Sequence, residues 1–432
     1  MNASSASGEG TVISGERAAN GSAGRGDDLP SSLAGVANVL WPHAPQVWVG
    51  GGEPPAGFRI VETFSVLPNA RHPRLLVPTL HPRAAAASLR QFNQGMSQIA
   101  RLRKAAVGMA LRTPAARFAA RETISVALAG SIDEADAGVL LSEHLRRLLG
   151  TSAITMSVSL GPIRPNMKPV LQLLTHDGRA VGYAKVAWNS LTSRLVTHEA
   201  SILRAWGEGP PSTFDVPALL GTESWADREI LVTSPVPHRL LRSGPLNGDV
   251  PDAALREIAE RSGRSRSALA AHPYWPSLRA RVENAAGEAR RAEVEGILDG
   301  LEQRHGADDI EFGAWHGDLA PGNTSIVGGR LHLWDWERSE AGVPLGLDPI
   351  HFHYQLVSFA GGRRVREAAR SGLERAGGAL VALGVPRDHH RLLSSLYLLE
   401  RFVRYEEGRS EGTLGAREAT IDELLEVLRE DA

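Results

Sequence analysis

The residues best suited to chemistry lie between positions 316 and 337. Residues 316–323 read His-Gly-Asp-Leu-Ala-Pro-Gly-Asn, so a carboxylate, Asp318, precedes an amide, Asn323, by five positions. A second carboxylate, Asp335, follows within the segment Trp-Asp-Trp-Glu. Oxygen-bearing side chains of this kind can hold a divalent cation and its bound phosphate. The spacing therefore predicts a site that holds a nucleotide phosphate against an attacking hydroxyl.

The residues that separate Asn323 from Asp335 predict a β-hairpin. Residues 324–327 and 330–333 have the composition of short strands, and a Gly-Gly pair between them favours a tight two-residue turn. Strands that pair outward from this turn bring Asn323 and Asp335 to the same end of the hairpin. The loop that carries Asp318 enters beside that end.

Each of these three side chains then has an expected role. Magnesium uses one or two protein oxygens and completes its octahedron with water and phosphate, so we expect Asn323 and Asp335 to be metal ligands. We expect Asp318 to accept or orient the proton of the substrate hydroxyl. The alternative is an ordinary polar turn that leads into a hairpin.

At these residues the chain resembles the aminoglycoside phosphotransferase and choline kinase group, which has the protein-kinase-like fold. His316-Gly317-Asp318 with Asn323 resembles the catalytic loop of that group. Asp335-Trp336-Glu337 resembles its metal-binding segment. The sequence leaves open whether Glu337 contacts a second metal ion or points to solvent.

The resemblance also implies a nucleotide site in the preceding part of the chain. Lys185 lies on the second arm of a hairpin that turns at Asp177-Gly178, and it is the residue expected to bind the α- and β-phosphates. Glu199, on the following helix, is its expected ion-pair partner. Gly161 is the one glycine offered by the expected phosphate-covering loop, which departs from the glycine-rich repeat of protein kinases.

Two further expectations concern the segments that flank the site. After a strand near residue 232 the chain reads Thr-Ser-Pro-Val-Pro, and proline has no N–H to donate. We therefore expect the carbonyl of Ser234 and the amide of Val236 to bind the nucleotide base. Asp348 is expected either to brace the catalytic loop, as in the related group, or to cap a helix. His316 is expected to pack under the loop and is not expected to be a base.

Composition excludes several other classes of function. The 432 residues contain no cysteine, which excludes disulfides, zinc thiolate sites and cysteine nucleophiles and is compatible with the reducing cytoplasm. The net charge of −2 does not favour nucleic acid as a partner. We find no P-loop motif and no apolar run long enough for a membrane span. Only three of the 47 basic residues are lysines, so each surviving lysine suggests a need for a compact ammonium group.

The pattern of apolar residues predicts four regions. Residues 1–33 are expected to be a disordered tail, 34–135 an N-terminal accessory module, 136–236 a nucleotide-binding small lobe, and 237–432 a catalytic and acceptor-binding helical lobe. Strands are expected at 46–49, 58–67, 75–77, 153–160, 169–175, 179–188, 218–225 and 229–233. Helices are expected at 83–111, 137–149, 195–206, 251–261, 275–304, 347–382, 386–407 and 416–430.

The sequence thus predicts an α+β, bilobal protein-kinase-like fold, with a small antiparallel-sheet lobe, a larger mainly helical lobe and an additional N-terminal module. The expected function is magnesium-assisted transfer of the γ-phosphate of ATP, or of GTP, to a hydroxyl of a small molecule. The alternative is a non-catalytic nucleotide-binding protein of the same fold, with a regulatory or scaffolding role.

Overall fold

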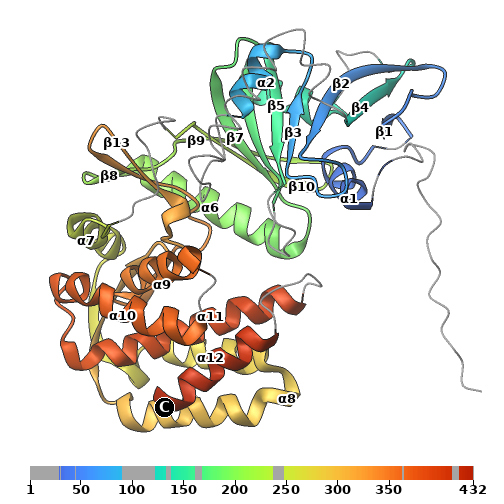
Figure 1. Cartoon of the computed structure of the whole chain (residues 1–432). Coiled ribbons are helices and arrows are strands. Elements are labelled where there is room, and N and C mark those ends of the chain that lie inside the picture. Colours follow the sequence, from blue (N-terminus) through green and yellow to red (C-terminus); the bar gives the residue numbers. More distant parts are fainter. Residues whose placement is uncertain are drawn as a thin grey trace, which may run out of the picture.

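A computed structural model describes residues 29, 31–43, 45–89, 122–132, 138–160, 168–236, 248–361, 364–410 and 418–431. Over these residues the chain forms two lobes, with strands gathered in one and helices in the other (Figure 1). The α+β, bilobal architecture expected from the sequence is therefore confirmed. None of the helices in the described ranges is both long and apolar enough to cross a lipid bilayer.

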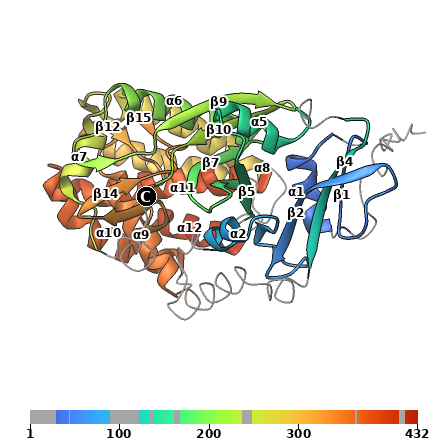
Figure 2. The same ribbon diagram turned by 90° about the horizontal axis from the view of Figure 1, so that it is seen from above.

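The small lobe is built on an antiparallel sheet of nine described strands, in the order β1-β4-β2-β3-β5-β6-β7-β10-β9. The strands are β1 (Val47–Gly50), β2 (Phe58–Leu67), β3 (Leu75–Pro78), β4 (Thr123–Ala129), β5 (Ile154–Ser159), β6 (Val170–Thr175), β7 (Ala180–Val186), β9 (Leu219–Trp225) and β10 (Arg228–Thr233). The N-terminal strands β1–β4 join this sheet through the pairing of β3 with β5. Figure 2 shows β1, β2 and β4 at the end of the molecule farthest from the helical lobe.

Helix α6 (Ser190–Glu208) lies between the sheet and the helical lobe (Figure 1). It begins with a capping box, in which the Asn189 side chain accepts from the backbone N–H of Thr192 and the Thr192 side chain accepts from that of Asn189. One face of the helix is buried against the core, including Glu199. This cap therefore fixes where the helix starts and which side chains it turns toward the cleft. Three shorter helices are also found in the part of this lobe that the structure describes, namely α1 (Ser31–Leu40), α2 (Pro82–Ser88) and α5 (Leu141–Leu148).

The large lobe is mainly helical. Its helices are α7 (Asp252–Glu260), α8 (Tyr274–His305), α9 (Leu347–Gly361), α10 (Val365–Ala382), α11 (His390–Ser410) and α12 (Glu418–Asp431). Two three-stranded sheets accompany them. One contains β11 (Ser265–Ala268), β12 (Asp309–Trp315) and β15 (Glu340–Pro344), and the other contains β8 (Phe214–Asp215), β13 (Thr324–Val327) and β14 (Arg330–Leu333).

Most expected elements are present within a few residues of their predicted bounds, including all ten strands. The continuous helix expected over 347–382 is wrong, because α9 ends at Gly361 and α10 begins at Val365. The Gly361-Gly362 pair explains the break, since glycine is a poor helix former. Of the helix expected over 83–111, the structure describes α2 and a turn at Leu89, and the remainder lies outside the described residues. The tail expected at 1–33 lies almost entirely outside them too.

Several strands were not anticipated from sequence, namely β4, β8, β11, β12 and β15. The sequence of β4, Thr-Ile-Ser-Val-Ala-Leu-Ala, contains alanines and a leucine that favour helices as readily as strands. Its position between β1 and β2 is set by partners distant in the chain. Tertiary pairing, rather than local propensity, determines this strand.

Candidate active site

The hairpin formed by β13 and β14 has the predicted register. Val327 pairs with Arg330 and Thr324 pairs with Leu333. Gly328 and Gly329 both have positive φ, 62° and 85°, which a two-residue turn of this kind requires. Beyond the last strand pair, the backbone N–H of Trp334 donates to the carbonyl of Asn323 over 3.2 Å. The hairpin therefore does bring its two flanking segments to one end.

Asp318 is held by side chains from both sides. The Asn323 amide nitrogen donates to the backbone carbonyl of Asp318 and to its Oδ2, both over 2.9 Å. The Nε2 atom of His351, on α9, lies 3.1 Å from Oδ1. Burial alone would raise the pKa of Asp318, but the His351 hydrogen bond and the nearby Arg404 and Arg401 hold that pKa well below its usual range. Asp318 is therefore an anchored, ionised carboxylate.

The backbone of the catalytic loop is braced by Asp348 at the start of α9. Its carboxylate accepts from the backbone N–H of His316 over 2.7 Å and from that of Gly317 over 3.1 Å. Burial raises the pKa of Asp348 to about 7, although these two donors oppose the shift. Gly317 has a φ of 80°, and a Cβ there would clash with the carbonyl of Arg338. Of the two roles that the sequence left open for Asp348, the structure shows bracing of the loop.

His316 packs beneath the loop, as expected. It is fully buried, and its ring centroid lies 4.2 Å from that of Trp336. Its Nδ1 accepts from the backbone N–H of Asp318 over 3.3 Å. Burial lowers its pKa to about 4, so the ring is neutral near pH 7. His316 thus supports the shape of the loop.

Lys185, on β7, links the two lobes. Its Nζ lies 2.5 Å from Oε2 of Glu199 on α6 and 2.5 Å from Oδ1 of Asp335, which follows β14 in the large lobe. Burial disfavours the ammonium, but Asp335 and Glu199 raise the pKa of Lys185 above its usual range. The expected pairing of Lys185 with Glu199 is therefore present, and the same ammonium also binds the expected metal ligand.

Asp335 has two features that are common at functional sites. Its φ of 72° is positive, which is rare for a residue other than glycine and carries backbone strain. Burial alone would raise its pKa, but Lys185 and Lys168 hold the pKa of Asp335 below its usual range. The carboxylate thus stays ionised in a largely enclosed place.

A second lysine in this region was not assigned a role from sequence. Lys168 lies just before β6, and its buried ammonium forms an ion pair with Glu337. Both side chains are less than a tenth exposed, at 5% and 8%. Glu337 also lies 4.0 Å from the ammonium of Lys185. Glu337 therefore does not point to solvent, and the scarcity of lysine in the chain was the one sequence signal for Lys168.

His351 was likewise given no role from the sequence, which favoured an ordinary core or surface histidine over a metal ligand. It is fully buried, and it bridges Asp318 to the hydroxyl of Tyr397, which lies 3.1 Å from Nδ1. Burial lowers the pKa of His351 to about 4, so the neutral ring donates from Nε2 to Asp318 and accepts at Nδ1 from Tyr397. Its position three residues after Asp348 was the available signal.

The oxygen donors near Asp335 fit a hard divalent cation. Carboxylate oxygens of Glu199, Asp335 and Glu337 lie within 4.8 Å of one another. The amide nitrogen of Asn323 is bound to Asp318, which leaves its carbonyl oxygen directed elsewhere. Magnesium prefers oxygen ligands of these types.

The remaining predicted residues are less informative. Gly161 lies outside the described residues. Ser234 and Val236 directly follow β10, and the backbone N–H of Ser234 donates to the carbonyl of Ala218 over 2.8 Å. The bond does not involve the Ser234 carbonyl, which is the group expected to bind the base. The structure therefore leaves this pair as a prediction.

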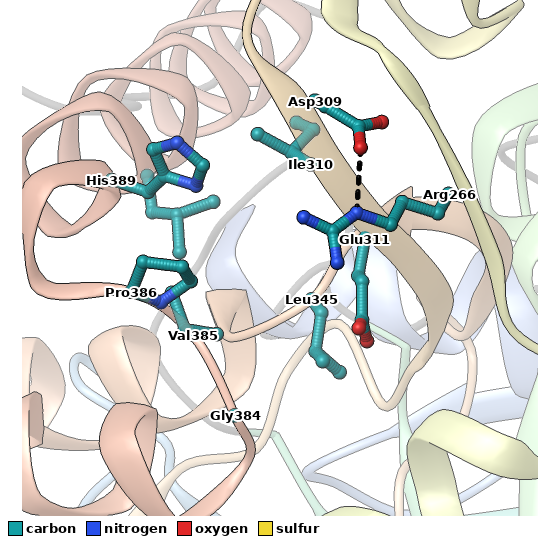
Figure 3. Close-up of a pocket in the computed structure, with 10 residues that line it drawn as sticks. Arg266, Asp309, Ile310, Glu311, Leu345, Gly384, Val385, Pro386 and His389 are labelled. Atoms are coloured by element: carbon teal, nitrogen blue, oxygen red, sulfur yellow. Dashed lines mark hydrogen bonds and ion pairs between the residues drawn. The ribbon is translucent and has the colours of Figure 1, made fainter.

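Two pockets among the described residues differ greatly in volume and in their distance from the site. A cavity beside Arg266, Asp309 and Pro386 has a volume of about 40 Å³ and lies among residues with no expected role (Figure 3). That volume is far below the several hundred Å³ of typical ligand sites. A larger pocket of about 460 Å³ includes Glu337 and Arg404 in its lining, so it adjoins both groups of site residues.

Comparison with known proteins gives structural similarity only. No protein-family model matches the chain, and no curated protein matches it. The ADP-bound aminoglycoside phosphotransferase APH(2'')-Ib is 12% identical, with a TM-score of 0.41, over 67% of this chain and 96% of the other. Choline kinase LicA from Streptococcus pneumoniae is 14% identical, with a TM-score of 0.45 and the same coverage of both chains. A glucosamine kinase is 13% identical, with a TM-score of 0.35, over 67% of this chain and 83% of the other.

These structures include members of the two groups that the sequence resembles, and all are small-molecule kinases by name. Identities and TM-scores this low assign neither a substrate nor an activity to the present chain.

Proposed function

We propose that the protein transfers the γ-phosphate of ATP, with GTP as the alternative donor, to a hydroxyl group of a small molecule. Residues 136–236 would bind the nucleotide, and residues 237–432 would supply the catalytic loop and the acceptor site. Residues 34–135 would form an accessory module attached through the β3–β5 pairing. Most of the rate enhancement would come from positioning and charge neutralisation.

Asp318 would act on the acceptor hydroxyl. Its pKa is lowered, so it is a weak proton acceptor in the ground state and a good acceptor of a hydrogen bond. It would aim the hydroxyl oxygen at the γ-phosphorus, where a new P–O bond forms as the bond to the β-phosphate oxygen breaks. The hydroxyl proton would pass to Asp318 late in this step, and the nucleoside diphosphate would leave.

Lys185 would hold the nucleotide phosphates, and Glu199 would aim its ammonium group. Asn323 and Asp335 would hold magnesium, which when bound neutralises phosphate charge. Lys185 is already paired with Asp335, so binding of the nucleotide requires both side chains to exchange partners. The base would be bound through the Ser234 carbonyl and the Val236 amide, and Gly161 would lie near the phosphates.

The observation that carries this proposal is the convergence of two anchored groups. Asp318 is fixed by Asn323 and His351, while Lys185 reaches across the lobes to Asp335. An ionised acid beside a buried lysine–carboxylate pair, at the junction of two lobes, suits phosphoryl transfer better than it suits a purely structural core.

The test is a screen for nucleotide turnover by the full chain. Release of ADP or GDP would be measured with and without magnesium, against pooled aminoglycosides, macrolides, amino alcohols and sugars. Magnesium-dependent turnover that rises with one pool supports the proposal. Tight nucleotide binding without turnover in any pool would instead identify the non-catalytic nucleotide-binding alternative.

A further inference from the structure

Helix α11 carries acidic and basic side chains beside the catalytic loop, and its acidic ones are already paired. Glu400 accepts from Arg281 of α8 over 2.7 Å. Glu406 pairs with Arg409 over 2.6 Å and with a second arginine on α8. Glu407 pairs with Arg338 over 3.2 Å. Every carboxylate in the described part of this helix therefore has a guanidinium partner.

Two arginines of the same helix, Arg401 and Arg404, have no carboxylate partner in the part of the chain that the structure describes. Among the described residues, no carboxylate oxygen comes within ion-pair distance of Arg401 or Arg404. Arg401 donates one hydrogen bond, from Nη2 to the hydroxyl of Tyr405 over 2.9 Å, and its buried Nε has no partner. Its guanidinium carbon lies 4.6 Å from the ring centroid of Tyr405 and 5.9 Å from that of Tyr354. Arg401 is thus a stacked cation without a counter-ion.

Both arginines lie at the Asp318 site. The Nη1 atom of Arg404 donates to the carbonyl of Gly317 over 2.6 Å, one residue before Asp318. Arg401 is four residues after Tyr397, so the two share a face of α11, and Tyr397 contacts Asp318 through His351.

Two of the nearby carboxylates are held by other groups, and Glu340 lines the same pocket as Arg404. Asp348 is buried and accepts from two loop amides. Asp335 is paired with Lys185. A molecule whose hydroxyl reaches Asp318 therefore approaches the guanidinium of Arg404, which is bound to the preceding residue, and Arg401 lies one turn earlier on the same helix. The rings of Tyr405 and Tyr354 already have a cation beside them, the guanidinium of Arg401.

We propose that the acceptor carries a carboxylate or phosphate group in addition to its hydroxyl, and that this anionic group binds to Arg401. This inference rests on the proposed phosphotransferase function and names the charge class of its substrate. A guanidinium offers a planar pair of donors that matches such an anion, and stacking on Tyr405 holds it in position. Arg404 keeps its bond to the loop and adds to the attraction. Polycationic acceptors are disfavoured at the same place.

The experiment compares acceptors that differ in charge but keep the same scaffold. One set is glucuronate, glucose and glucosamine, and a second is glycerate, glycerol and 3-aminopropane-1,2-diol. Magnesium-dependent ADP release gives kcat and KM for each member. The anionic member is expected to exceed the neutral one by about tenfold in kcat/KM, with the cationic member lowest.

Variants of the arginine test the assignment of the residue. Arg401→Gln is expected to lower kcat/KM for the anionic member by about 30- to 100-fold, mainly through KM. Arg401→Lys should recover part of this loss. Arg409→Gln removes the same charge from an exposed arginine on the same helix, whose buried partner Glu406 keeps a second arginine, so it serves as the matched control and should change KM less than twofold.

A binding assay keeps the inference testable if none of these scaffolds is phosphorylated. The thermal midpoint of the full chain would be measured with magnesium, a non-hydrolysable ATP analogue and each acceptor. We expect the anionic members to raise the midpoint in the wild type and not in Arg401→Gln. Equal midpoints in the two proteins, or preference for a neutral or cationic acceptor, would overturn this inference while leaving the phosphotransferase proposal intact. Loss of nucleotide binding and turnover altogether would overturn both.

Discussion

Two clusters of charged side chains lie near each other at the junction of the lobes, and they satisfy their charges in different ways. The Asp318 cluster, made of Asp318, Asn323, His351, Arg401 and Arg404, holds one carboxylate by hydrogen bonds from an amide and a neutral imidazole. The Lys185 cluster, made of Lys168, Lys185, Glu199, Asp335 and Glu337, holds three carboxylates by two ammonium groups. The geometry of the Asp318 cluster is fixed in the absence of a ligand, whereas the charged groups of the Lys185 cluster form ion pairs with one another.

This difference indicates which part of the site changes on binding. Hydrogen bonds from neutral donors can persist while a hydroxyl approaches Asp318, so the acceptor side is preorganised. If Lys185 binds phosphate and Asp335 binds a cation, as proposed, the Lys185–Asp335 ion pair occupies the places of both ligands. Ligand binding would then replace ion pairs in the Lys185 cluster and add to an existing geometry in the Asp318 cluster.

Asp318→Asn should have the largest effect and tests the catalytic half of the comparison. The amide keeps the shape but cannot take the hydroxyl proton, so kcat should fall by about 10² to 10⁴-fold. Nucleotide affinity should stay within about twofold, because the phosphates are assigned to the Lys185 cluster. Steady-state turnover and a separate nucleotide titration provide the measurement. Near-normal turnover in this variant would remove Asp318 from its assigned role.

Lys168→Met tests whether the other cluster is held together by ion pairing. Removing this ammonium leaves the buried Glu337 with only the more distant Lys185. Breaking a buried pair from one side costs about 3 kcal/mol in the free energy of unfolding. Chemical denaturation followed by fluorescence measures the loss.

The matched control for this pair is Glu337→Gln combined with Lys168→Met. The double variant removes both charges, so it should lose clearly less stability than the sum of the two single variants. Additive losses of stability would show that Lys168 and Glu337 do not act as a pair. The statement that ion pairs hold the Lys185 cluster together would then be wrong.

The two clusters also differed in how far the sequence could predict them. The β13–β14 hairpin followed from a Gly-Gly turn and short apolar strands, which are local signals. That turn alone placed Asn323 and Asp335 at one end. The Lys185–Glu199 pairing came from the resemblance to a known family, and the structure shows it at 2.5 Å.

The interactions missed from sequence are those between residues distant in the chain. Lys168 and Glu337 are separated by 169 positions, and no local pattern relates them. His351 lies 33 positions after Asp318, on a helix whose orientation depends on packing against α10 and α11. Sequence periodicity predicts which face of α9 is apolar, but not which catalytic group that face meets.

His351→Gln tests whether the Asp318 cluster relies on a neutral ring. The pKa of His351 is about 4 in the folded state and about 6.5 in the unfolded chain. Between these values the unfolded state binds more protons, so stability is fully present above pH 6.5 and falls as the pH drops toward 4. This group should account for a loss of about 2 kcal/mol at pH 5.

His316 has a similar lowered pKa and remains in the variant, so the pH dependence should weaken without vanishing. Denaturation midpoints at pH 5 and pH 7 give the comparison between the two proteins. An unchanged pH dependence in His351→Gln would mean that the pKa of the ring is the same in the folded and unfolded states. A steeper loss of stability at pH 5 in the variant would mean that the folded ring is protonated and forms an ion pair with Asp318. The two clusters would then be alike.

Tyr397→Phe should have the smallest effect, and it tests whether Tyr397 belongs to the Asp318 cluster. The phenol hydroxyl donates to Nδ1 of His351, which in turn donates to Asp318. Losing one such hydrogen bond costs about 1 kcal/mol, and the ring contact with His351 is kept. We expect kcat to fall about fivefold with nucleotide KM unchanged, because only the orientation of the imidazole is loosened. If the KM for the nucleotide rises instead, Tyr397 supports the Lys185 cluster. The Asp318 cluster would then not be specific to the acceptor, and the proposed division between the two clusters would be wrong.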